Sequence, residues 1–174
     1  GEWVLSIDAD EVVTPELASE IKSVIGSTDK AGFYIPRKNL YKEKWLRHGG
    51  QYPDYVLRLF RRGSGRFSPS RVHEKVIVEG HCGRLKEPLL HYTFRDLSSL
   101  IDKINKYSSL SAEELYQAGR RCGPLSPVMH FLSFFIRDYI LRLGFLDGLE
   151  GLNVAFVKAL GIYLKYAKLR DMTK

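Results

Sequence analysis

The stretch WVLSIDADEVVTPEL, residues 3–17, joins a run that is apolar except for Ser6 to a cluster of acids and then to the start of a helix. Residues 3–7 predict a short interior strand, since an apolar run bounded by polar residues fits a strand covered on both faces. Thr14 can cap a helix, and Pro15 fits the first helical position, where no backbone donor is needed. Apolar residues then recur at helical spacing, so the stretch predicts a strand, an acidic turn and a helix.

Three acids, Asp8, Asp10 and Glu11, follow the predicted strand. Binding sites of open α/β sheets lie at the carboxyl ends of strands. Two carboxylates separated by one residue repel each other unless a cation lies between them, and oxygen ligands suit Mg²⁺ or Mn²⁺. A metal held in this way can bridge a diphosphate. The alternative is that the three acids are solvated turn residues or help to cap the helix that follows.

The next part of the chain is expected to be rich in strands. Glycine-containing turns separate four candidate strands. The first begins with residues 32–36, and the others lie at residues 55–60, 72–78 and 85–92. Together with the first strand and its helix, they predict an α/β fold that contains part of a mixed sheet.

A helical region is expected after this sheet. Apolar residues recur at helical spacing over 97–107, and the segment that begins at Ser111 has the capping-box form typical of a helix start. Two glycines and two prolines interrupt the helices between residues 119 and 127. The expected organisation is a sheet domain over 1–95, connecting helices over 96–122 and a carboxyl-terminal amphipathic helical region over 123–174.

The last two helical segments are apolar but interrupted by charge. Arg137, Asp138 and Arg142 lie within the first, and Lys158 lies within the second, so neither is expected to cross a membrane. Helices rich in Phe, Leu and Tyr with basic residues at intervals can lie in a membrane interface. Equally, the two helices can pack on the core of the domain or on another subunit.

The net charge of +7 is unevenly distributed. Residues 37–75 contain eleven Lys or Arg and three acids, a net charge of +8. Such a segment favours polyanionic partners, namely a nucleotide diphosphate, a phosphorylated lipid-linked sugar or an anionic membrane. Nucleic acid is not expected as a partner, because no recognised binding module accompanies the charge. The alternative is a solvated basic surface.

The two cysteines, Cys82 and Cys122, are too few and too unpatterned for a disulfide framework or a zinc site. They fit a reducing, cytoplasmic setting.

Several stretches of the chain resemble family 2 glycosyltransferases, the inverting enzymes of the GT-A fold. The acidic stretch GEWVLSIDADEVVTPEL resembles the Asp-X-Asp region of that family. Further stretches resemble the branch that adds sugars to the inner core of lipopolysaccharide: YVLRLFRR, RVHEKV, LLHYTF and RDYILRLGFLDGLEGLNVAFVKALGIYLKYAKL.

The resemblance implies a partial GT-A sheet, the acceptor-side half, followed by helices. It also implies that Asp8 and Asp10 hold Mg²⁺ or Mn²⁺ with the diphosphate of a nucleotide-sugar donor, and that His91 supplies a third ligand. The alternative for His91 is a core histidine. In the family the acidic motif follows a nucleotide-binding half, whereas here it begins at residue 8. Such a chain, with Gly1 in place of an initiator, is expected to be the carboxyl-terminal part of an enzyme and can be inactive alone.

Inverting transfer needs a base that takes the proton from the acceptor hydroxyl. Glu74 is the candidate base, and Asp54 is the rival. His73 can orient a sugar or phosphate. The alternatives are a solvent-facing Glu74 and a His73 that merely packs.

Several other side chains are candidates for substrate binding. Planar guanidinium groups suit phosphate oxygens, which makes Arg58, Arg61 and Arg62 candidates for the diphosphate or for a phosphorylated acceptor. Trp45 and Tyr52 can stack on a sugar ring or serve as buried anchors.

The sequence therefore predicts a glycosyltransferase that moves a sugar, preferably a hexose from a UDP-sugar, to a lipid-linked oligosaccharide acceptor of the lipopolysaccharide core or cell envelope. A cytoplasmic enzyme on the inner face of the membrane would fit this reaction. The alternative is a non-catalytic membrane-associated or oligomerising module. A phosphohydrolase is disfavoured, because no second cluster of carboxylates or histidines is dense enough for two metals. An exposed sheet edge invites pairing with another chain, so a homodimer is expected.

Overall fold

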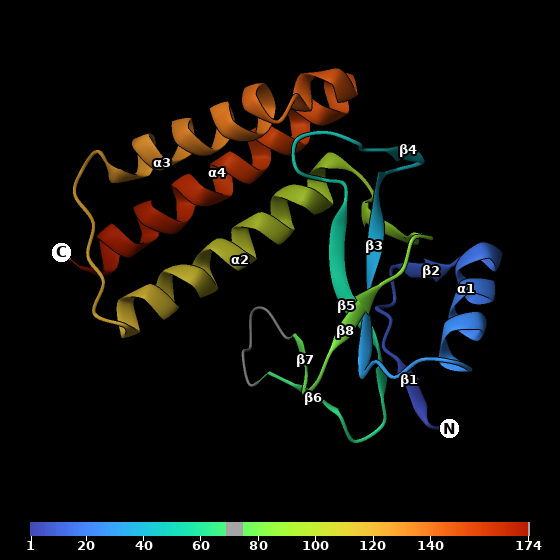
Figure 1. Ribbon diagram of the computed structural model, residues 1–174. Coiled ribbons are helices and arrows are strands. Elements are labelled where there is room, and N and C mark those ends of the chain that lie inside the picture. Colours follow the sequence, from blue (N-terminus) through green and yellow to red (C-terminus); the bar gives the residue numbers. More distant parts are fainter. Residues whose placement is uncertain (69–74, 174) are drawn as a thin grey trace. The chain divides into compact units, whose positions relative to one another are not determined.

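The computed structural model describes residues 1–68 and 75–173 (Figure 1). The chain divides into two compact units. The sheet unit comprises Gly1–Trp45 and Gln51–Thr93, and the helical unit comprises Leu46–Gly50 and Phe94–Lys174. The prediction of a mixed α/β sheet with carboxyl-terminal helices is confirmed.

The main sheet has the strand order β1-β5-β3-β9-β2. Its strands are β1 (Trp3–Leu5), β5 (Asp54–Arg61), β3 (Gly32–Tyr41), β9 (Leu89–Phe94) and β2 (Glu11–Val13). The ladders β1–β5, β3–β5 and β2–β9 are antiparallel.

Four shorter strands complete the sheet unit. The strand β8 (Cys82–Arg84) pairs with β3 in parallel, which makes the sheet mixed, and β4 (Lys44–Trp45) pairs with β3 in antiparallel fashion. A separate antiparallel pair is formed by β6 (Gly65–Phe67) and β7 (Val76–Val78).

The prediction of an interior strand at residues 3–7 is wrong. The strand β1 lies at one end of the sheet and is paired with β5, with Trp3 opposite Arg61. All three residues of β1 are half-buried. The apolar run is explained by local packing around Trp3. The centroid of the Trp3 ring lies 6.0 Å from that of Phe33 and 4.8 Å from the guanidinium carbon of Arg61. An apolar run of this kind therefore does not require a strand that is covered on both faces.

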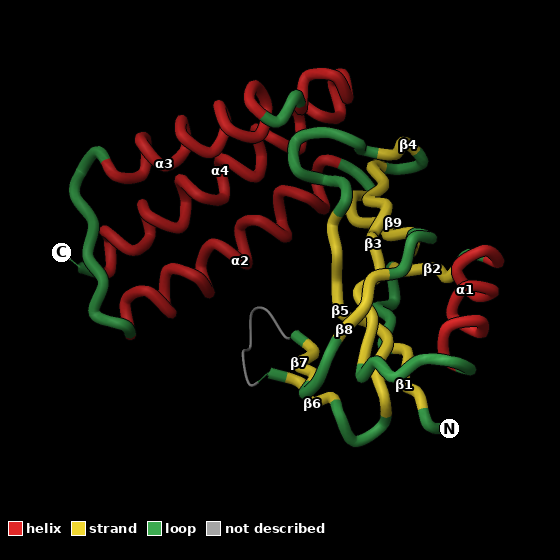
Figure 2. The backbone as a smooth tube through the Cα atoms, in the orientation of Figure 1, coloured by secondary structure: helices red, strands yellow, loops and turns green. Residues whose placement is uncertain are grey.

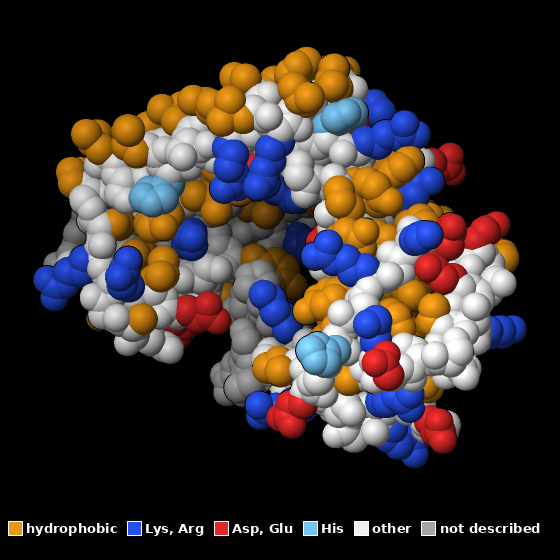
Figure 3. Space-filling model, in the orientation of Figure 1, with side chains coloured by type: hydrophobic (Ala, Val, Ile, Leu, Met, Phe, Trp, Pro, Cys, Tyr) orange, Lys and Arg blue, Asp and Glu red, His pale blue; other side chains and the backbone are white. Residues whose placement is uncertain are grey.

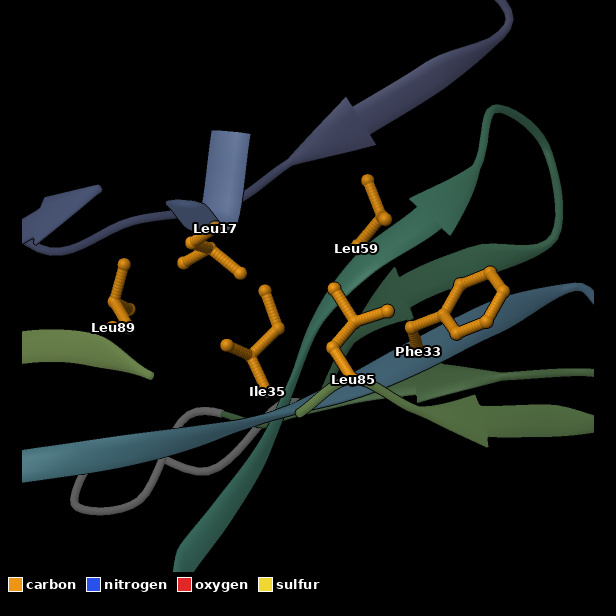
Figure 4. Packing of buried hydrophobic residues seen from close by; sticks show 6 residues of the cluster. All are labelled: Leu17, Phe33, Ile35, Leu59, Leu85 and Leu89. Atoms are coloured by element: carbon orange, nitrogen blue, oxygen red, sulfur yellow. The ribbon is translucent and has the colours of Figure 1, made fainter. Parts of the chain in front are cut away.

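The helix α1 (Pro15–Ile25) begins as predicted. The backbone N–H of Leu17 donates to Thr14 Oγ1 at 3.1 Å, and Pro15 occupies the first turn. The side chain of Leu17 is fully buried and packs with strand residues of the sheet unit (Figure 4). The core cluster consists of Leu17, Phe33, Ile35, Leu59, Leu85 and Leu89. The predicted acidic turn is thereby held between a paired strand and a helix anchored in the core.

The helical unit contains three long helices, with α4 packed against both α2 and α3 (Figure 2). The elements in chain order are α2 (Leu97–Gln117), α3 (Ser126–Phe135), a π-helical segment η1 (Ile136–Leu141), a 3-10 turn η2 (Gly144–Asp147) and α4 (Gly148–Met172). The predicted break between residues 119 and 127 is confirmed. No helix within the described ranges combines the length and apolar character needed to cross a membrane.

The predicted helix start at Ser111 is wrong, because α2 continues through it. Asp96 caps α2 instead. Its side chain accepts from the backbone N–H of Ser99 at 2.7 Å, and Ser99 Oγ in turn accepts from the backbone N–H of Asp96 at 3.3 Å. Ala112, next to Ser111, is fully buried. Packing inside the helical unit therefore overrides the local capping signal at Ser111.

The loop Leu46–Gly50 belongs to the helical unit although its neighbours in sequence lie in the sheet unit. The Asp147 carboxylate accepts from the backbone N–H of His48 at 2.8 Å and lies 2.9 Å from His48 Nδ1. The backbone N–H of Gly49 donates to the carbonyl of Arg142 at 2.8 Å. Gly49 has a positive φ of 62°, which suits glycine at this turn.

Candidate functional site

The acidic turn is organised around Glu11. Glu11 opens β2, and its side chain has 0% exposure, whereas the Asp8 side chain is 54% exposed. Glu11 Oε2 accepts from the backbone N–H of Asp8 at 2.9 Å, and the backbone N–H of Glu11 donates to the carbonyl of Asp8 at 3.0 Å. These two bonds close the turn and fix the position of the residues between them.

Arg58 of β5 compensates the buried negative charge. Its Nη2 donates to Glu11 Oε1 at 2.8 Å and also forms an ion pair with Asp8. Burial acts to lower the pKa of Arg58, but hydrogen bonds and charge attraction from Glu11 and Asp8 outweigh it, so the pKa lies above its ordinary value. Arg58 therefore stays charged and draws Asp8 toward β5.

Arg37 of β3 extends the network to Asp54. Its Nη1 lies 3.4 Å from Glu11 Oε1, while its Nε and Nη2 donate to Asp54 Oδ2 at 3.0 and 2.6 Å. Sequence reasoning missed Arg37. The sequence does contain a signal for this residue. Arg37 and Asn39 are polar residues two positions apart in a largely apolar strand, so their side chains lie on the same face of the sheet.

Asn39 connects this network to His91 of β9. Asn39 Nδ2 donates to the carbonyl of Gln51 at 2.9 Å, so its Oδ1 is the atom that faces His91. His91 Nδ1 lies 2.7 Å from Asn39 Oδ1 and must carry a proton to bond there. Thr93 Oγ1 also donates to Asn39 Oδ1 at 3.1 Å. The imidazole is therefore oriented with Nε2 toward the acidic turn.

His91 Nε2 lies 3.4 Å from Asp10 Oδ2, which brings together two of the residues predicted to hold a metal. A neutral imidazole with a protonated Nδ1 presents a lone pair at Nε2, so two acceptors face each other unless a proton or a cation lies between them. Histidine ligands of metals characteristically donate their other ring N–H to an acceptor, and Asn39 Oδ1 and Thr93 Oγ1 lie 2.7 and 2.8 Å from His91 Nδ1, where they can accept such a bond.

The remaining predicted ligand, Asp8, forms an ion pair with Arg58. In residues 1–68 and 75–173, no group of three His, Cys, Asp or Glu side chains is arranged to hold a metal ion. Mg²⁺ commonly uses one or two protein carboxylates together with substrate phosphates and waters. The structure brings together only Asp10 and His91 of the three predicted ligands, and metal binding by this pair stays a prediction.

The remaining candidate residues lie in different settings. Arg61 donates from Nε to the carbonyl of Lys30 at 3.2 Å and from Nη2 to that of Thr28 at 2.7 Å, which ties the end of β5 to the neighbouring loop. Arg62 follows β5 and is exposed. Phosphate binding by either side chain stays a prediction.

Trp45 and Tyr52 lie together in the sheet unit. Their rings meet edge to face at 5.1 Å, and Lys38 Nζ lies 4.4 Å from the Trp45 ring centroid. Stacking of either ring on a sugar stays a prediction.

The candidate base Glu74 and its neighbour His73 lie outside the described residues.

No family model matches the chain, but it is similar to several glycosyltransferases. It is 31% identical over 180 residues to the lipopolysaccharide core biosynthesis glycosyltransferase LpsC of Rhizobium meliloti (strain 1021), a match that covers 95% of this chain and 65% of LpsC. It is 27% identical over 190 residues to the uncharacterized glycosyltransferase RP128 of Rickettsia prowazekii (strain Madrid E), covering 99% of this chain and 63% of RP128. The chain thus spans less than two thirds of the length of these relatives.

Proposed function

We propose that this protein is a glycosyltransferase that moves a sugar, preferably a hexose, from a nucleotide-diphosphate donor to a glycan of the lipopolysaccharide core or cell envelope. The observation that carries this proposal is the similarity of nearly the whole chain to relatives named as glycosyltransferases, one of them named for lipopolysaccharide core biosynthesis. A UDP-sugar donor and a lipid-linked oligosaccharide acceptor are part of the same proposal.

The site geometry supports a metal-dependent mechanism at the acidic turn. Asp10 and His91 would hold Mg²⁺ or Mn²⁺, because Asp10 Oδ2 and His91 Nε2 lie 3.4 Å apart and the contact with Asn39 orients the imidazole. When bound, the cation would supply positive charge to the diphosphate and stabilise the departing nucleotide.

The chain's own cations would add to this stabilisation. Arg58 remains charged at the edge of the acidic turn, held there by Glu11. Guanidinium groups suit phosphate oxygens, so exchange of the exposed Asp8 carboxylate for a diphosphate oxygen would leave the Glu11–Arg58 pair intact. A diphosphate oxygen would in this way replace Asp8 as the partner of Arg58, and the Asp8 carboxylate could then bind the cation when the donor binds.

Sugar transfer would be an inverting displacement on a GT-A-type sheet of family 2. The acceptor hydroxyl would attack the anomeric carbon from the side opposite the nucleotide, and the bond from that carbon to the diphosphate oxygen would break. A carboxylate would take the hydroxyl proton. Glu74 is proposed for this role. Asp54 is the less suited carboxylate, because Arg37 holds its Oδ2 with two hydrogen bonds.

A transfer assay tests this function. The protein is incubated with Mn²⁺, a panel of nucleotide-sugars and a truncated lipopolysaccharide core, and release of nucleoside diphosphate is followed together with the mass of the glycan. We expect release that requires the acceptor and adds one sugar to it, with a loss of at least about 100-fold in Asp10→Asn and no change in the exposed control Asp102→Asn. Phosphate release without a change in glycan mass would contradict transfer and favour a phosphohydrolase.

A further inference from the structure

One face of the helical unit exposes a continuous series of apolar side chains. The large hydrophobic residues that are exposed between Leu125 and Leu149 have exposures from 44% to 72%, whereas the aromatic residues Phe131, Phe135 and Tyr139 are partly buried. Hydrophobic side chains gather along the edge formed by α3 in the space-filling view (Figure 3). A patch of this kind on a protein surface marks a contact with another molecule more often than an isolated exposed leucine does.

The series follows helical spacing and therefore lies along one side. We name as the apolar face the five residues Leu125, Met129, Leu132, Ile136 and Ile140, which recur every three or four positions along α3 and η1. This stripe is about 20 Å long at the rise of a helix. The opposite side of α3 packs on α4, where Phe131 and Phe135 meet Phe156 at ring distances of 5.6 and 6.3 Å. The five residues of the apolar face therefore do not contribute to the core of the helical unit, and their side chains are exposed.

The exposed charged side chains between Leu125 and Leu149 have one sign. The acids between Leu125 and Leu149, all of whose residues are described, are Asp138 and Asp147, and both are buried. Asp138 Oδ1 accepts from Arg137 at 2.8 Å and from Arg142 at 3.3 Å, while the two arginine side chains remain about half exposed. Asp147 is engaged by the loop at His48. Residues 118–173 contain eight Lys or Arg and four acids, a net charge of +4.

We propose that the apolar face is a membrane-docking surface that lies in the interface of a bilayer containing anionic lipids. Exposed Leu, Met and Ile side chains would enter the boundary of headgroups and acyl chains, and Arg137 and Arg142 would meet the lipid phosphates. Asp138, which is buried, bonds both arginines and keeps them ordered beside the face without presenting negative charge to the membrane.

The one-signed charge favours lipid over a protein partner. A leaflet that contains anionic lipids presents negative charge throughout, and it therefore complements a stretch that carries cations and no exposed carboxylate between Leu125 and Leu149. A second copy of the chain would bring the same cations against themselves, which disfavours a self-pairing face.

Vesicle flotation tests the proposal. The chain is mixed with vesicles of phosphatidylcholine alone or of phosphatidylcholine and phosphatidylglycerol at 7:3. We expect flotation with the anionic vesicles, weakened by salt. The triple variant Met129→Gln, Ile136→Gln, Ile140→Gln should lower partitioning by at least about tenfold, because it removes the apolar contact. The matched control Leu97→Gln, Ile101→Gln, Tyr116→Gln changes three exposed apolar residues of α2 and should float like wild type.

Hydrogen exchange of the unmodified chain gives a second readout that does not depend on the folding of a variant. Anionic vesicles should slow exchange in residues 125–149 more than in α2. Three results would overturn the proposal. The wild-type chain would fail to float, the triple variant would float as well as wild type, or vesicles would slow exchange only in other segments. A dimer in solution that the triple variant dissociates, without vesicle binding, would show that the face is a protein interface. None of these results depends on sugar transfer.

Discussion

Glu11 Oε1 accepts a hydrogen bond from Arg58 Nη2 at 2.8 Å, and the Glu11 side chain is fully buried while it does so. This pair joins the start of β2 to β5, two strands that are not neighbours in the sheet. Of the three acids in the turn, the one outside the Asp-X-Asp motif is therefore the one that fixes the structure. Asp8 and Asp10 are left at the surface or partly exposed, where a ligand can reach them.

Glu11→Gln should destabilise the protein. The substitution removes the buried negative charge that Arg37 and Arg58 share, and breaking such a pair costs about 3 kcal/mol. Urea unfolding measures the free energy of unfolding. The exposed control Glu43→Gln should stay within about 0.5 kcal/mol of wild type. Equal effects of the two variants would mean that Glu11 is not the anchor of the turn.

Gly151→Ala should destabilise the helical unit. A Cβ at Gly151 would lie 2.1 Å from the carbonyl oxygen of Gly144, so α4 and η2 must separate, at a cost of about 1–3 kcal/mol. A Cβ at Gly123 would meet nothing within 4 Å, which makes Gly123→Ala the matched control. Thermal unfolding followed by circular dichroism should show a lower melting temperature for Gly151→Ala alone. An unchanged melting temperature would refute the close approach.

Asp147→Asn should loosen the loop around His48. The carboxylate accepts from the backbone N–H groups of Arg47 and His48 and lies 2.9 Å from His48 Nδ1, and an amide offers one acceptor oxygen in place of two. Amide hydrogen exchange should accelerate at Arg47 and His48. The exposed substitution Asp102→Asn on α2 should leave these amides unchanged. Slow exchange in Asp147→Asn would show that the loop is held by other contacts.

Asn39→Ala should weaken binding of Mn²⁺ without removing a ligand. Asn39 Oδ1 fixes the ring of His91, and loss of such a supporting partner commonly lowers metal affinity by about 10–100-fold. The affinity for Mn²⁺ can be measured by electron paramagnetic resonance. Asn153→Ala in α4 serves as the control. Unaltered affinity in Asn39→Ala would argue against His91 as a ligand.

Local parts of the fold could be predicted from the sequence. The cap at Thr14 and the start at Pro15 depend on neighbouring residues alone, and both were found. The capping-box form at Ser111 was misleading because burial of α2 against α4, two segments distant in sequence, decides whether that helix continues. The position of β1 at one end of the sheet also depends on distant pairing, which an apolar run does not encode.

The same distinction applies to the site. Asp10 and His91 were predicted together, and they lie together because β2 pairs with β9 with Glu11 opposite His91. The sequence could not predict that Arg58 holds Asp8, or that Arg37 joins Glu11 to Asp54, since these contacts follow from the registers of β3 and β5. Glu11 was expected in a turn, and its burial appears only when those two arginines are in place.

Calorimetric titration of UDP into the protein, with and without Mn²⁺, tests the central claim most directly. The claim is that the acidic turn holds a divalent cation and a donor diphosphate through Asp10 and His91. It predicts UDP binding that requires Mn²⁺, is lost in Asp10→Asn and persists in Asp102→Asn. Binding of UDP that is the same without Mn²⁺ or in Asp10→Asn would contradict it.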